Sequence, residues 1–437
     1  MREIIVAGCG PAGMLAAIAA AREGAKVTIL EAQEKPGRKL LMTGNGRCNL
    51  TNLDPKLPRS YYGTDPETVR KLASGIFEQF SVSDTLAFFE ELGLLTMDKN
   101  GYIYPYTGQA SSVLELLLQE LRRLKVKLKF SEKILSATWR DGWWDVNTAS
   151  WTYRCDHLIL ACGSRAISST GSDGSGYTLA KQMGHSIVPV LPALTALNVK
   201  GNSFASCFGV RCHAKISLCV MTGNSKDNAA WETLAQDTGE LQWTDNGISG
   251  IVVFQVSRFA SRALHNGNKV RVILDFLPEI PSVELRSILG KLTERYSEET
   301  AGQAFSGLLP AKLMSAVLEQ MRMKSSMKAG NITEKQLSSL AYVIKNLVLP
   351  IHGTRDFEQC QVCTGGVALE EVEAETLNSK ICPGLSMAGE ILDIDGPCGG
   401  YNLQWAWSSG YVAGTHAARK SADPSKENEI RFRESTE

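Results

Sequence analysis

The start of the chain alternates between short apolar runs and one helical run. Residues 3–7 (EIIVA) and 26–30 (KVTIL) are mostly apolar and of strand length, and residues 14–22 between them are mostly small and apolar. A nearly continuous apolar strand is typical of a parallel sheet that helices cover on both faces. The pattern therefore predicts a β-strand, a helix and a second, parallel β-strand.

The same alternation continues over the next part of the chain. Six further segments show either a helical spacing of apolar residues or a strand-like run: 67–79, 82–92, 111–124, 126–130, 133–139 and 157–161. The first three segments have the helical spacing and the last three are strand-like. The first part of the chain is therefore predicted to be α/β.

The pattern changes near residue 190 and changes back near residue 350. Short apolar runs such as 251–254 and 270–276 are separated by turns and indicate an antiparallel β module. Residues 281–346 are charged and helical, with Pro310 as a break. After about residue 350 the α/β pattern returns, with a strand at 385–388 and a helix at 403–418.

A glycine-rich turn connects the first strand to the first helix. Gly8, Gly10 and Gly13 fit G-x-G-x-x-G, in which the glycines permit a tight turn, close approach of a pyrophosphate and close helix packing. The helix start adds amide donors and a positive dipole. Glu31 ends the second strand, where a carboxylate accepts hydrogen bonds from ribose hydroxyls. The unit therefore predicts a dinucleotide site, for either NAD or FAD.

Two further glycine-rich segments favour FAD. Residues 37–49 (GRKLLMTGNGRCN) follow the second strand, and Arg38, Lys39 and Arg47 can face a phosphate or an electron-rich ring. Residues 389–402 (GEILDIDGPCGGYN) lie far along the chain, between a strand and a helix. FAD needs distant chain segments because its flavin extends well beyond the pyrophosphate, and amides at a helix start stabilise charge on the reduced ring.

These observations predict an α/β fold in which a Rossmann-like FAD-binding domain is interrupted by an insert. Its parts are expected to be an FAD-binding first part (1–190), a β-rich insert domain (191–280), a small helical subdomain (281–348), the completion of the FAD-binding domain (349–420) and a polar tail (421–437).

Composition narrows the class of protein. The chain has 437 residues, enough for two or three domains, and 46 basic and 46 acidic residues give a net charge of zero. Nucleic-acid-binding proteins usually carry a basic excess, so we expect no nucleic-acid partner. Because no secretory signal and no apolar run of about 20 residues is visible, we expect no membrane span and a cytoplasmic location.

Eleven cysteines are scattered along the chain. An odd count without a signal peptide favours reduced thiols. Cys360 and Cys363 form a C-x-x-C, which is either a redox pair, half of a zinc site or two cysteines on a strand. No second C-x-x-C completes a zinc site, so the strand interpretation is favoured and no metal is expected.

At its glycine-rich segments the chain resembles the bacterial HI0933-like flavoproteins, NAD(P)/FAD-dependent oxidoreductases that include bile-acid enone reductases and aminoacetone oxidases. The resemblance covers almost the whole chain and is most specific at residues 37–52 and 389–410, the latter with YNLQWAW at 401–407. Residues 174–177 (GSGY) and Gly184-His185 also fit. The chain departs from the family in its insert, with Trp-Thr-Asp at 243–245 where Phe-Thr-His is frequent.

The resemblance implies that the first glycine turn and Glu31 hold the ADP part of FAD, that the backbone near Ile134 borders adenine, and that the two later glycine loops approach pyrophosphate and flavin. The expected cofactor-binding residues are Gly8, Gly10, Pro11, Ala12, Gly13, Glu31, Arg38, Lys39, Gly44, Asn45, Gly46, Arg47, Cys48, Asn49, Ile134, Ala161, Gly163, Gly389, Glu390, Asp393, Gly400, Tyr401, Asn402 and Leu403.

No residue is singled out as catalytic. His185 follows a glycine at a helix end, where packing or capping is the commoner role, and His352 stands near the return to the first domain. Cys48 lies in the glycine-rich segment 37–49, which is expected to approach the flavin. It is interpreted either as a reactive thiol or as a passive small residue. Tyr401 is equally suited to hydrogen bonding with flavin or to packing.

Three functions remain open. The first is an NAD(P)H-linked flavin reductase of a conjugated C=C in a small oxo compound, of the 3-oxo bile-acid or steroid type. Since no second G-x-G-x-x-G unit is present, NADH or NADPH would visit only transiently. The second is an amine oxidase that uses O₂, of the aminoacetone type. The third is a flavin-binding redox sensor without catalysis.

Overall fold

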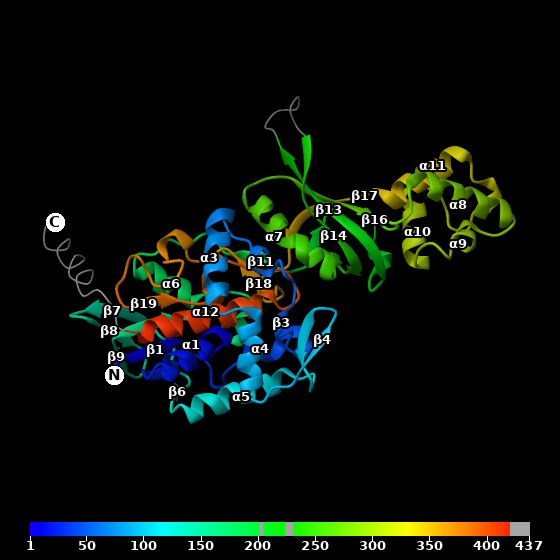
Figure 1. Ribbon diagram of the computed structural model, residues 1–437. Helices are drawn as coiled ribbons and strands as arrows, with labels where there is room; N and C mark the ends of the chain where they lie inside the picture. The colour runs from blue at the N-terminus through cyan, green and yellow to red at the C-terminus, as the bar shows by residue number, and fades with distance from the viewer. Residues whose placement is uncertain (202–203, 223–229, 420–437) are drawn as a thin grey trace. The chain divides into compact units, whose positions relative to one another are not determined.

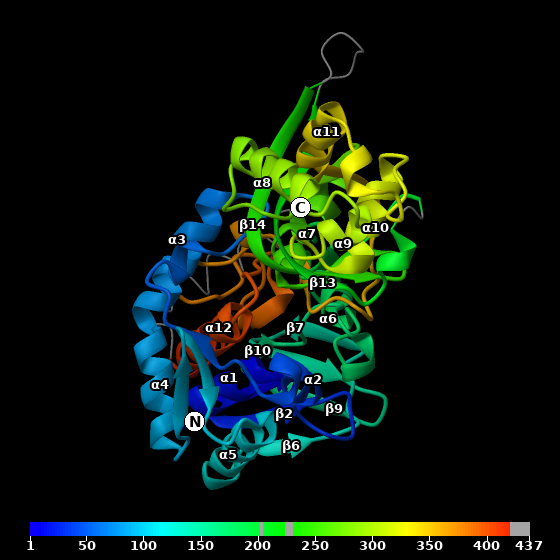
Figure 2. The ribbon, with the colours of Figure 1, turned by 90° about the vertical axis from the view of Figure 1, so that its right-hand side faces the viewer.

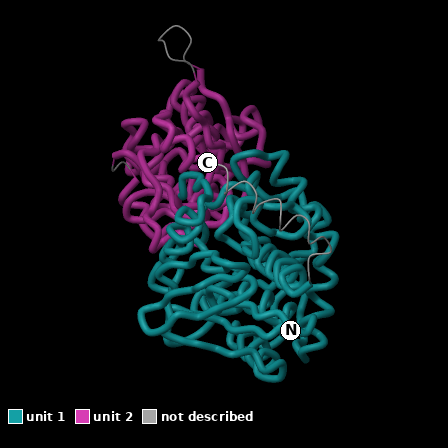
Figure 3. The backbone as a smooth tube through the Cα atoms, turned by 90° about the vertical axis from the view of Figure 1, so that its left-hand side faces the viewer, with its two compact units in different colours: residues 1–190, 362–437 teal, residues 191–361 magenta. Residues whose placement is uncertain are grey.

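The chain forms two compact units. A computed structural model describes residues 1–201, 204–222 and 230–419. Residues 1–190 and 362–437 form unit 1, and residues 191–361 form unit 2, as the two colours of Figure 3 show. Each unit is built around its own cluster of buried apolar side chains. The nucleotide-binding motifs of the sequence all belong to unit 1.

Unit 1 contains a five-stranded parallel sheet. Its strands are β1 (Glu3–Ala7), β2 (Lys26–Leu30), β6 (Lys127–Lys129), β10 (His157–Leu160) and β19 (Leu385–Met387). Across the sheet they run in the order β19-β10-β1-β2-β6, and all neighbours are parallel. In chain order this is the 3-2-1-4-5 arrangement of dinucleotide-binding folds. The predicted Rossmann-like class is therefore confirmed.

Two helices that are far apart in the sequence pack tightly in unit 1. Helix α1 (Pro11–Arg22) lies alongside α12 (Tyr401–Ala418) in Figure 1. A Cβ atom at Gly410 or Gly414 of α12 would stand within 3.0 Å of the carbonyl oxygen of Ala12 or Ala16. The backbones of the two helices are therefore as close as glycine allows.

Five further α-helices lie in the described part of unit 1. They are α2 (Arg38–Met42), α3 (Pro66–Gln79), α4 (Val82–Glu91), α5 (Ala110–Arg123) and α6 (Ser175–Gln182). Local sequence fixes the start of α4, because Ser81 and Asp84 form a reciprocal capping box. The periodic helices predicted near 67–79, 82–92 and 111–124 correspond to α3, α4 and α5.

Small antiparallel sheets accompany the main sheet in unit 1. One has the order β3-β5-β4 and another the order β7-β8-β9. The bounds are β3 (Thr51–Asn52), β4 (Thr96–Lys99), β5 (Tyr102–Pro105), β7 (Ser136–Arg140), β8 (Trp143–Asn147) and β9 (Thr152–Cys155), and the short strand β18 (Val362–Thr364) begins the C-terminal part. The β3-β5-β4 sheet lies beside two of the glycine segments, because a Cβ atom at Gly400 would stand 2.6 Å from the Thr51 carbonyl oxygen and one at Gly44 would stand 3.7 Å from the Tyr104 ring.

Unit 2 contains a closed six-stranded barrel of order β12-β15-β14-β13-β16-β17. Its strands are β12 (Leu197–Val199), β13 (Arg211–Thr222), β14 (Ala230–Thr244), β15 (Gly247–Ser249), β16 (Val270–Asp275) and β17 (Leu347–Thr354), and β11 (Leu191–Ala193) precedes them. Strands β13 and β14 are the longest, and Figure 2 shows them running side by side.

Two expectations for this region differ from the structure. Residues 251–254 were expected to be a strand, but they begin helix α7 (Ile251–His265). A short apolar run rich in valine fits a strand or a buried helix equally well, and burial of one face of α7 decides here for the helix. The return to unit 1 was expected at residue 349, but β17 closes the barrel by pairing with β12 and β16, so residues 349–361 stay in unit 2.

The helical part of unit 2 lies between β16 and β17 in the chain. Its helices are α8 (Ser282–Arg295), α9 (Ala301–Ala304), α10 (Ala311–Gln320) and α11 (Glu334–Lys345). Pro310, predicted to be a break, precedes α10. Over the described ranges of both units, no helix combines the length and apolar character that crossing a bilayer requires.

A buried histidine makes the sheet of unit 1 sensitive to acid. His157 of β10 is 3% exposed, and its Nε2 lies 2.6 Å from the hydroxyl of Ser386 in β19. The Ser386 hydroxyl donates to the Oδ1 atom of Asn378, so it accepts from Nε2. Burial lowers the pKa of His157 from 6.5 to about 3. The neutral ring is therefore the form that the folded sheet holds.

We expect acid to destabilise unit 1 through this ring. Between pH 6.5 and 3 the unfolded chain binds one proton more, so the free energy of unfolding falls as pH falls, by about 2–3 kcal/mol between pH 7 and 4.5. Urea unfolding of His157→Gln should show a correspondingly flatter dependence over this range. His213→Gln, at an exposed imidazole, is the control. An unchanged slope in His157→Gln would contradict the prediction.

Candidate nucleotide site

The sheet of unit 1 reverses its strand order between β1 and β10. Ligands of open α/β sheets bind at the carboxyl ends of strands, at such a switch point. Gly8 follows β1 there with φ +103°, and a Cβ atom on it would stand 2.6 Å from the carbonyl oxygen of Ala161, which follows β10. The predicted Gly8, Ala161 and Gly163 therefore lie where the fold places a ligand.

The glycine turn has the shape that its sequence predicts. A Cβ atom at Gly13 would stand within 3.0 Å of the Gly8 carbonyl oxygen, so the turn is too tight for a side chain there. Gly10 caps α1 without a side-chain hydrogen bond, Pro11 occupies the first turn, and Ala12 is buried. A Cβ atom at Gly10 would meet no protein atom within 4 Å. The backbone at Gly10 is thus open to a ligand at the start of α1.

Glu31 closes the other side of the turn. Its carboxylate accepts hydrogen bonds from the amides of Cys9 (2.7 Å) and Gln33 (2.9 Å). The backbone carbonyl of Glu31 accepts a hydrogen bond from the backbone amide of Glu132. The segment that leads to the buried Ile134 therefore lies beside Glu31. A cavity of about 610 Å³ is lined by Ala32, Gln33, Glu34, Lys35, Arg38 and Ser131. Among the expected cofactor-binding residues, Arg38 lines this cavity, which lies next to the segment that begins at Glu31.

The second glycine segment runs back toward the turn. The Gly37 amide donates to the Cys9 carbonyl at 3.0 Å, and Arg38 donates to the Gln33 side chain at 2.6 Å. Gly44, Asn45, Gly46 and Cys48 have positive φ, a run that makes a sharply folded loop. Residues 44–47 of this loop are exposed, whereas Cys48 and Asn49 are buried beneath it.

The third glycine segment reaches the start of α1. A Cβ atom at Gly389 would stand 2.8 Å from the Cβ of Ala12. The indole of Trp405 donates to the Gly389 carbonyl at 3.1 Å, and the Gly389 amide donates to the Ser409 hydroxyl at 2.9 Å. Both α12 residues are buried, and they hold the segment against α1.

The start of α12 is shaped by the end of the same segment. Gly400 caps the helix with φ 95° and without a side-chain hydrogen bond. The Asn402 side chain bonds the Gly396 amide at 2.8 Å and its carbonyl at 2.9 Å, and Leu403 is half-buried beside it. The amides at this helix start are available for the negative charge of a reduced ring.

One carboxylate connects the second and third glycine segments to the chain that follows β10. Glu390 Oε2 lies 2.6 Å from Lys39 Nζ and accepts a 3.0 Å hydrogen bond from the Ser164 hydroxyl. Ser164 was not among the predicted residues. Its place one residue after Gly163, at the carboxyl end of a central strand, was the signal that could have identified it.

Two predicted residues are engaged elsewhere. Asp393 is 2% exposed, and its carboxylate accepts from the Thr64 amide at 2.8 Å. The Tyr401 hydroxyl donates to Asp54 at 2.7 Å, and burial, with this hydrogen bond, raises the pKa of Tyr401. These contacts order the protein around the site, so a direct contact of either side chain with FAD is not supported by them.

His185, a candidate catalytic group of unit 1, takes part in a hydrogen-bond cluster that stabilises the fold. The His185 Nδ1 donates to Glu371, so its Nε2 accepts from the Ser379 hydroxyl, which itself accepts from the amides of Ile381 and Cys382. Burial lowers the pKa of His185 despite the carboxylate. The Ser379 oxygen already accepts hydrogen bonds from two backbone amides, so it is not available as a nucleophile. The cluster therefore stabilises a turn.

Cys48 is fully buried, and burial raises the pKa of its thiol to about 12. A thiol with that pKa stays protonated at neutral pH, and the thiolate is the reactive form. The passive interpretation of Cys48 is therefore favoured. None of the eleven cysteines forms a disulfide, Cys360 and Cys363 included, and the described residues contain no cluster of three or more metal-ligating side chains.

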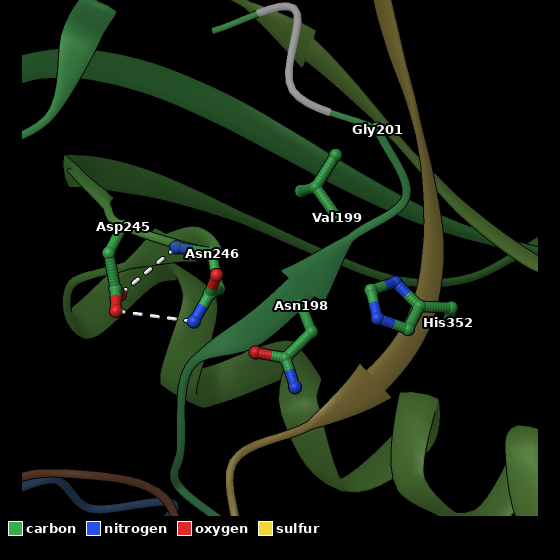
Figure 4. Close-up of a pocket in the computed structure, with 6 residues that line it drawn as sticks. All are labelled: Asn198, Val199, Gly201, Asp245, Asn246 and His352. Atoms are coloured by element: carbon green, nitrogen blue, oxygen red, sulfur yellow. Dashed lines mark hydrogen bonds between the residues drawn. The ribbon is translucent and has the colours of Figure 1, made fainter. Parts of the chain in front are cut away.

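His352 belongs to unit 2, outside the nucleotide-binding unit. It is exposed on β17 and lines a cavity of about 420 Å³ together with Asn198, Val199, Gly201, Asp245 and Asn246, as Figure 4 shows. Both amide groups of Asn246 donate to Asp245, which also pairs with Arg355. His352 is therefore described as part of a pocket within unit 2.

Comparisons with known proteins show which proteins this chain is similar to. The family model described as HI0933-like protein Rossmann domain matches residues 2–416. A 3-dehydro-bile acid delta(4,6)-reductase of Clostridium scindens is 42% identical over 422 residues, which cover 96% of this chain and 100% of that protein. A ribosomal RNA dihydrouridine synthase of Escherichia coli is 26% identical over 94% of this chain and 96% of that protein. Among solved structures, a 3-ketosteroid-delta4-(5alpha)-dehydrogenase from Rhodococcus jostii is 16% identical, with a TM-score of 0.48 and coverage of 96% and 97%.

Proposed function

Because the chain belongs to the HI0933-like family, we propose that it is an FAD-dependent reductase of a C=C bond conjugated to a carbonyl group, in an oxo compound of the bile-acid or steroid class. The observation that carries the proposal is the 42% identity to a delta(4,6)-reductase over the full length of both proteins. Similarity at that level extends over both the nucleotide-binding unit and unit 2, to which substrate specificity is expected to belong.

The residues of unit 1 fit FAD. The open space at Gly10 suits a pyrophosphate, Glu31 suits ribose hydroxyls, and the start of α12 suits an electron-rich ring. FAD, when bound, supplies the hydride for reduction, and the protein binds and orients the reactants. We further propose NADH or NADPH as the transient electron donor.

The proton that completes such a reduction must come from an acid or from water. Tyr401 directs its proton to Asp54, and the Cys48 thiol is fully buried. Neither group is therefore assigned as the acid.

A second candidate is reduction of uridine in RNA. Two relatives with the name ribosomal RNA dihydrouridine synthase are 26% identical over nearly the whole chain. Dihydrouridine is uridine with its C5=C6 bond saturated, and that bond is conjugated to a carbonyl, so both substrates need the same type of hydride transfer. The lower identity and the net charge of zero place this candidate second.

Anaerobic mixing separates the candidates. We expect NADH or NADPH to bleach the flavin absorbance, and a 3-oxo-Δ4 or 3-oxo-Δ4,6 bile acid to restore it. The same reduced protein is mixed with a saturated 3-oxo bile acid as control, with ribosomal RNA fragments, and with O₂. Reoxidation of the flavin by the RNA fragments but by none of the bile acids would favour uridine reduction.

Two further outcomes would contradict the proposal. Peroxide release with aminoacetone, without reaction with any enone, would indicate an amine oxidase. A flavin that neither nicotinamide reduces would overturn the proposed donor, and a chain that forms no complex with FAD would overturn the cofactor itself.

A further inference from the structure

The contact between Lys39 and Glu390 joins parts of the chain that are distant in sequence. Lys39 belongs to α2, Glu390 is the second residue of the last glycine segment, and Ser164, the third member, follows β10. The side chains of Lys39 and Glu390 are only 21% and 18% exposed. Because water is largely excluded, this ion pair is stronger than a pair on the open surface.

The three segments meet around the glycine turn. The Gly37 amide bonds the Cys9 carbonyl, two residues before Lys39. Ala161, three residues before Ser164, has its carbonyl against Gly8. Gly389, the residue before Glu390, lies against Ala12. The Glu390 carboxylate therefore connects the segments that surround the site assigned to the dinucleotide.

We propose that Lys39, Glu390 and Ser164 form a clasp that holds these segments together around bound FAD and slows its release. The dinucleotide leaves when the segments separate, and separation requires the ion pair and the serine hydrogen bond to break. The three residues act as positioning residues through the segments that carry them. The inference rests on FAD as the cofactor, and it is independent of the substrate that the flavin reduces.

The alternative is that Lys39 leaves Glu390 and binds a phosphate of FAD directly. Glu390 would then compete with the cofactor for Lys39. The two arrangements predict opposite consequences of removing the carboxylate charge, which makes them distinguishable by mutation.

The experiment measures the rate at which FAD leaves the purified holoprotein after dilution, from the rise of free-flavin fluorescence, without substrate or nicotinamide. The variants are Glu390→Gln, Lys39→Met and the double variant. Glutamine keeps an acceptor for Ser164 and removes only the charge. We expect each single variant to release FAD about 10-fold faster, and the double variant to be no faster than either, because both changes break one interaction.

The matched control is the exposed pair of Arg122 and Glu115 in α5, whose side chains are 61% and 55% exposed. Glu115→Gln and Arg122→Met should leave the release rate unchanged. Slower or unchanged release in Glu390→Gln, together with faster release in Lys39→Met, would overturn the clasp in favour of direct phosphate binding.

The clasp would also be overturned if the increases in the FAD release rate in the two single variants multiplied in the double variant. Failure of enone reduction by a protein that releases FAD as expected would remove the proposed substrate and leave the clasp intact. A chain that never binds FAD would remove both.

Discussion

Replacement of Gly414 by alanine is expected to destabilise unit 1 by about 3 kcal/mol or more, although alanine is normally the better helix residue. The new methyl group would stand within 3.0 Å of the Ala16 carbonyl oxygen of α1, a backbone atom that cannot move aside alone. Helices α1 and α12 would have to separate. Since α1 begins at the nucleotide turn, FAD retention should fall together with the melting temperature.

Gly290 provides a matched control for this effect. It also lies inside a helix, α8, but a Cβ atom there would meet nothing within 4 Å. Gly290→Ala should therefore stabilise the protein by about 0.5–1 kcal/mol through helix propensity. Thermal unfolding of both variants checks the prediction, and equal shifts of the same sign would refute the close packing of α1 and α12 as the cause.

Replacement of Gly10 by valine is expected to abolish FAD binding while the protein still folds. The backbone at Gly10 has φ −88° and ψ −175°, which any residue adopts, and the space around it holds no protein atom. The side chain would enter the path assigned to the pyrophosphate. We expect FAD affinity to fall at least about 100-fold, since loss of close backbone contact removes several hydrogen bonds to charged groups.

The apoprotein shows whether the effect is specific to the cofactor. The unfolding free energy of apo Gly10→Val should change by no more than about 1 kcal/mol, the cost of a poorer helix cap. Gly75→Ala, in helix α3, where a Cβ atom would make only ordinary contact, should retain FAD. Normal flavin binding by Gly10→Val would place the pyrophosphate elsewhere.

The sequence predicts those parts of the fold whose cause is local. The strands at 3–7 and 26–30 and the glycine turn between them follow from apolar runs and the tolerance of glycine for tight turns, and the structure has them where expected. The run at 251–254 was ambiguous, because four apolar residues fit a strand or a helix. The family and the reductase character of its relatives were likewise accessible, because the glycine loops are long motifs.

Contacts between distant segments were not accessible in the same way. Lys39 and Glu390 were each expected to face the cofactor, yet nothing local shows that they pair with each other. The end of unit 2 was missed for the same reason: residues 349–354 look like any strand, and only pairing with β12 and β16 assigns them to the barrel. Long-range pairing depends on topology, which spacing along the chain does not encode.

The interrupted course of unit 1 has a consequence for biosynthesis. Strand β19 and helix α12 are translated only after all of unit 2, although they pack against β10 and α1, which belong to the first 190 residues. In the first 190 residues, one sheet edge and one face of α1 therefore stay uncovered until β19 and α12 have been translated. Unit 2 is free to fold first, and we expect unit 1 to bind FAD only after α12 has been translated.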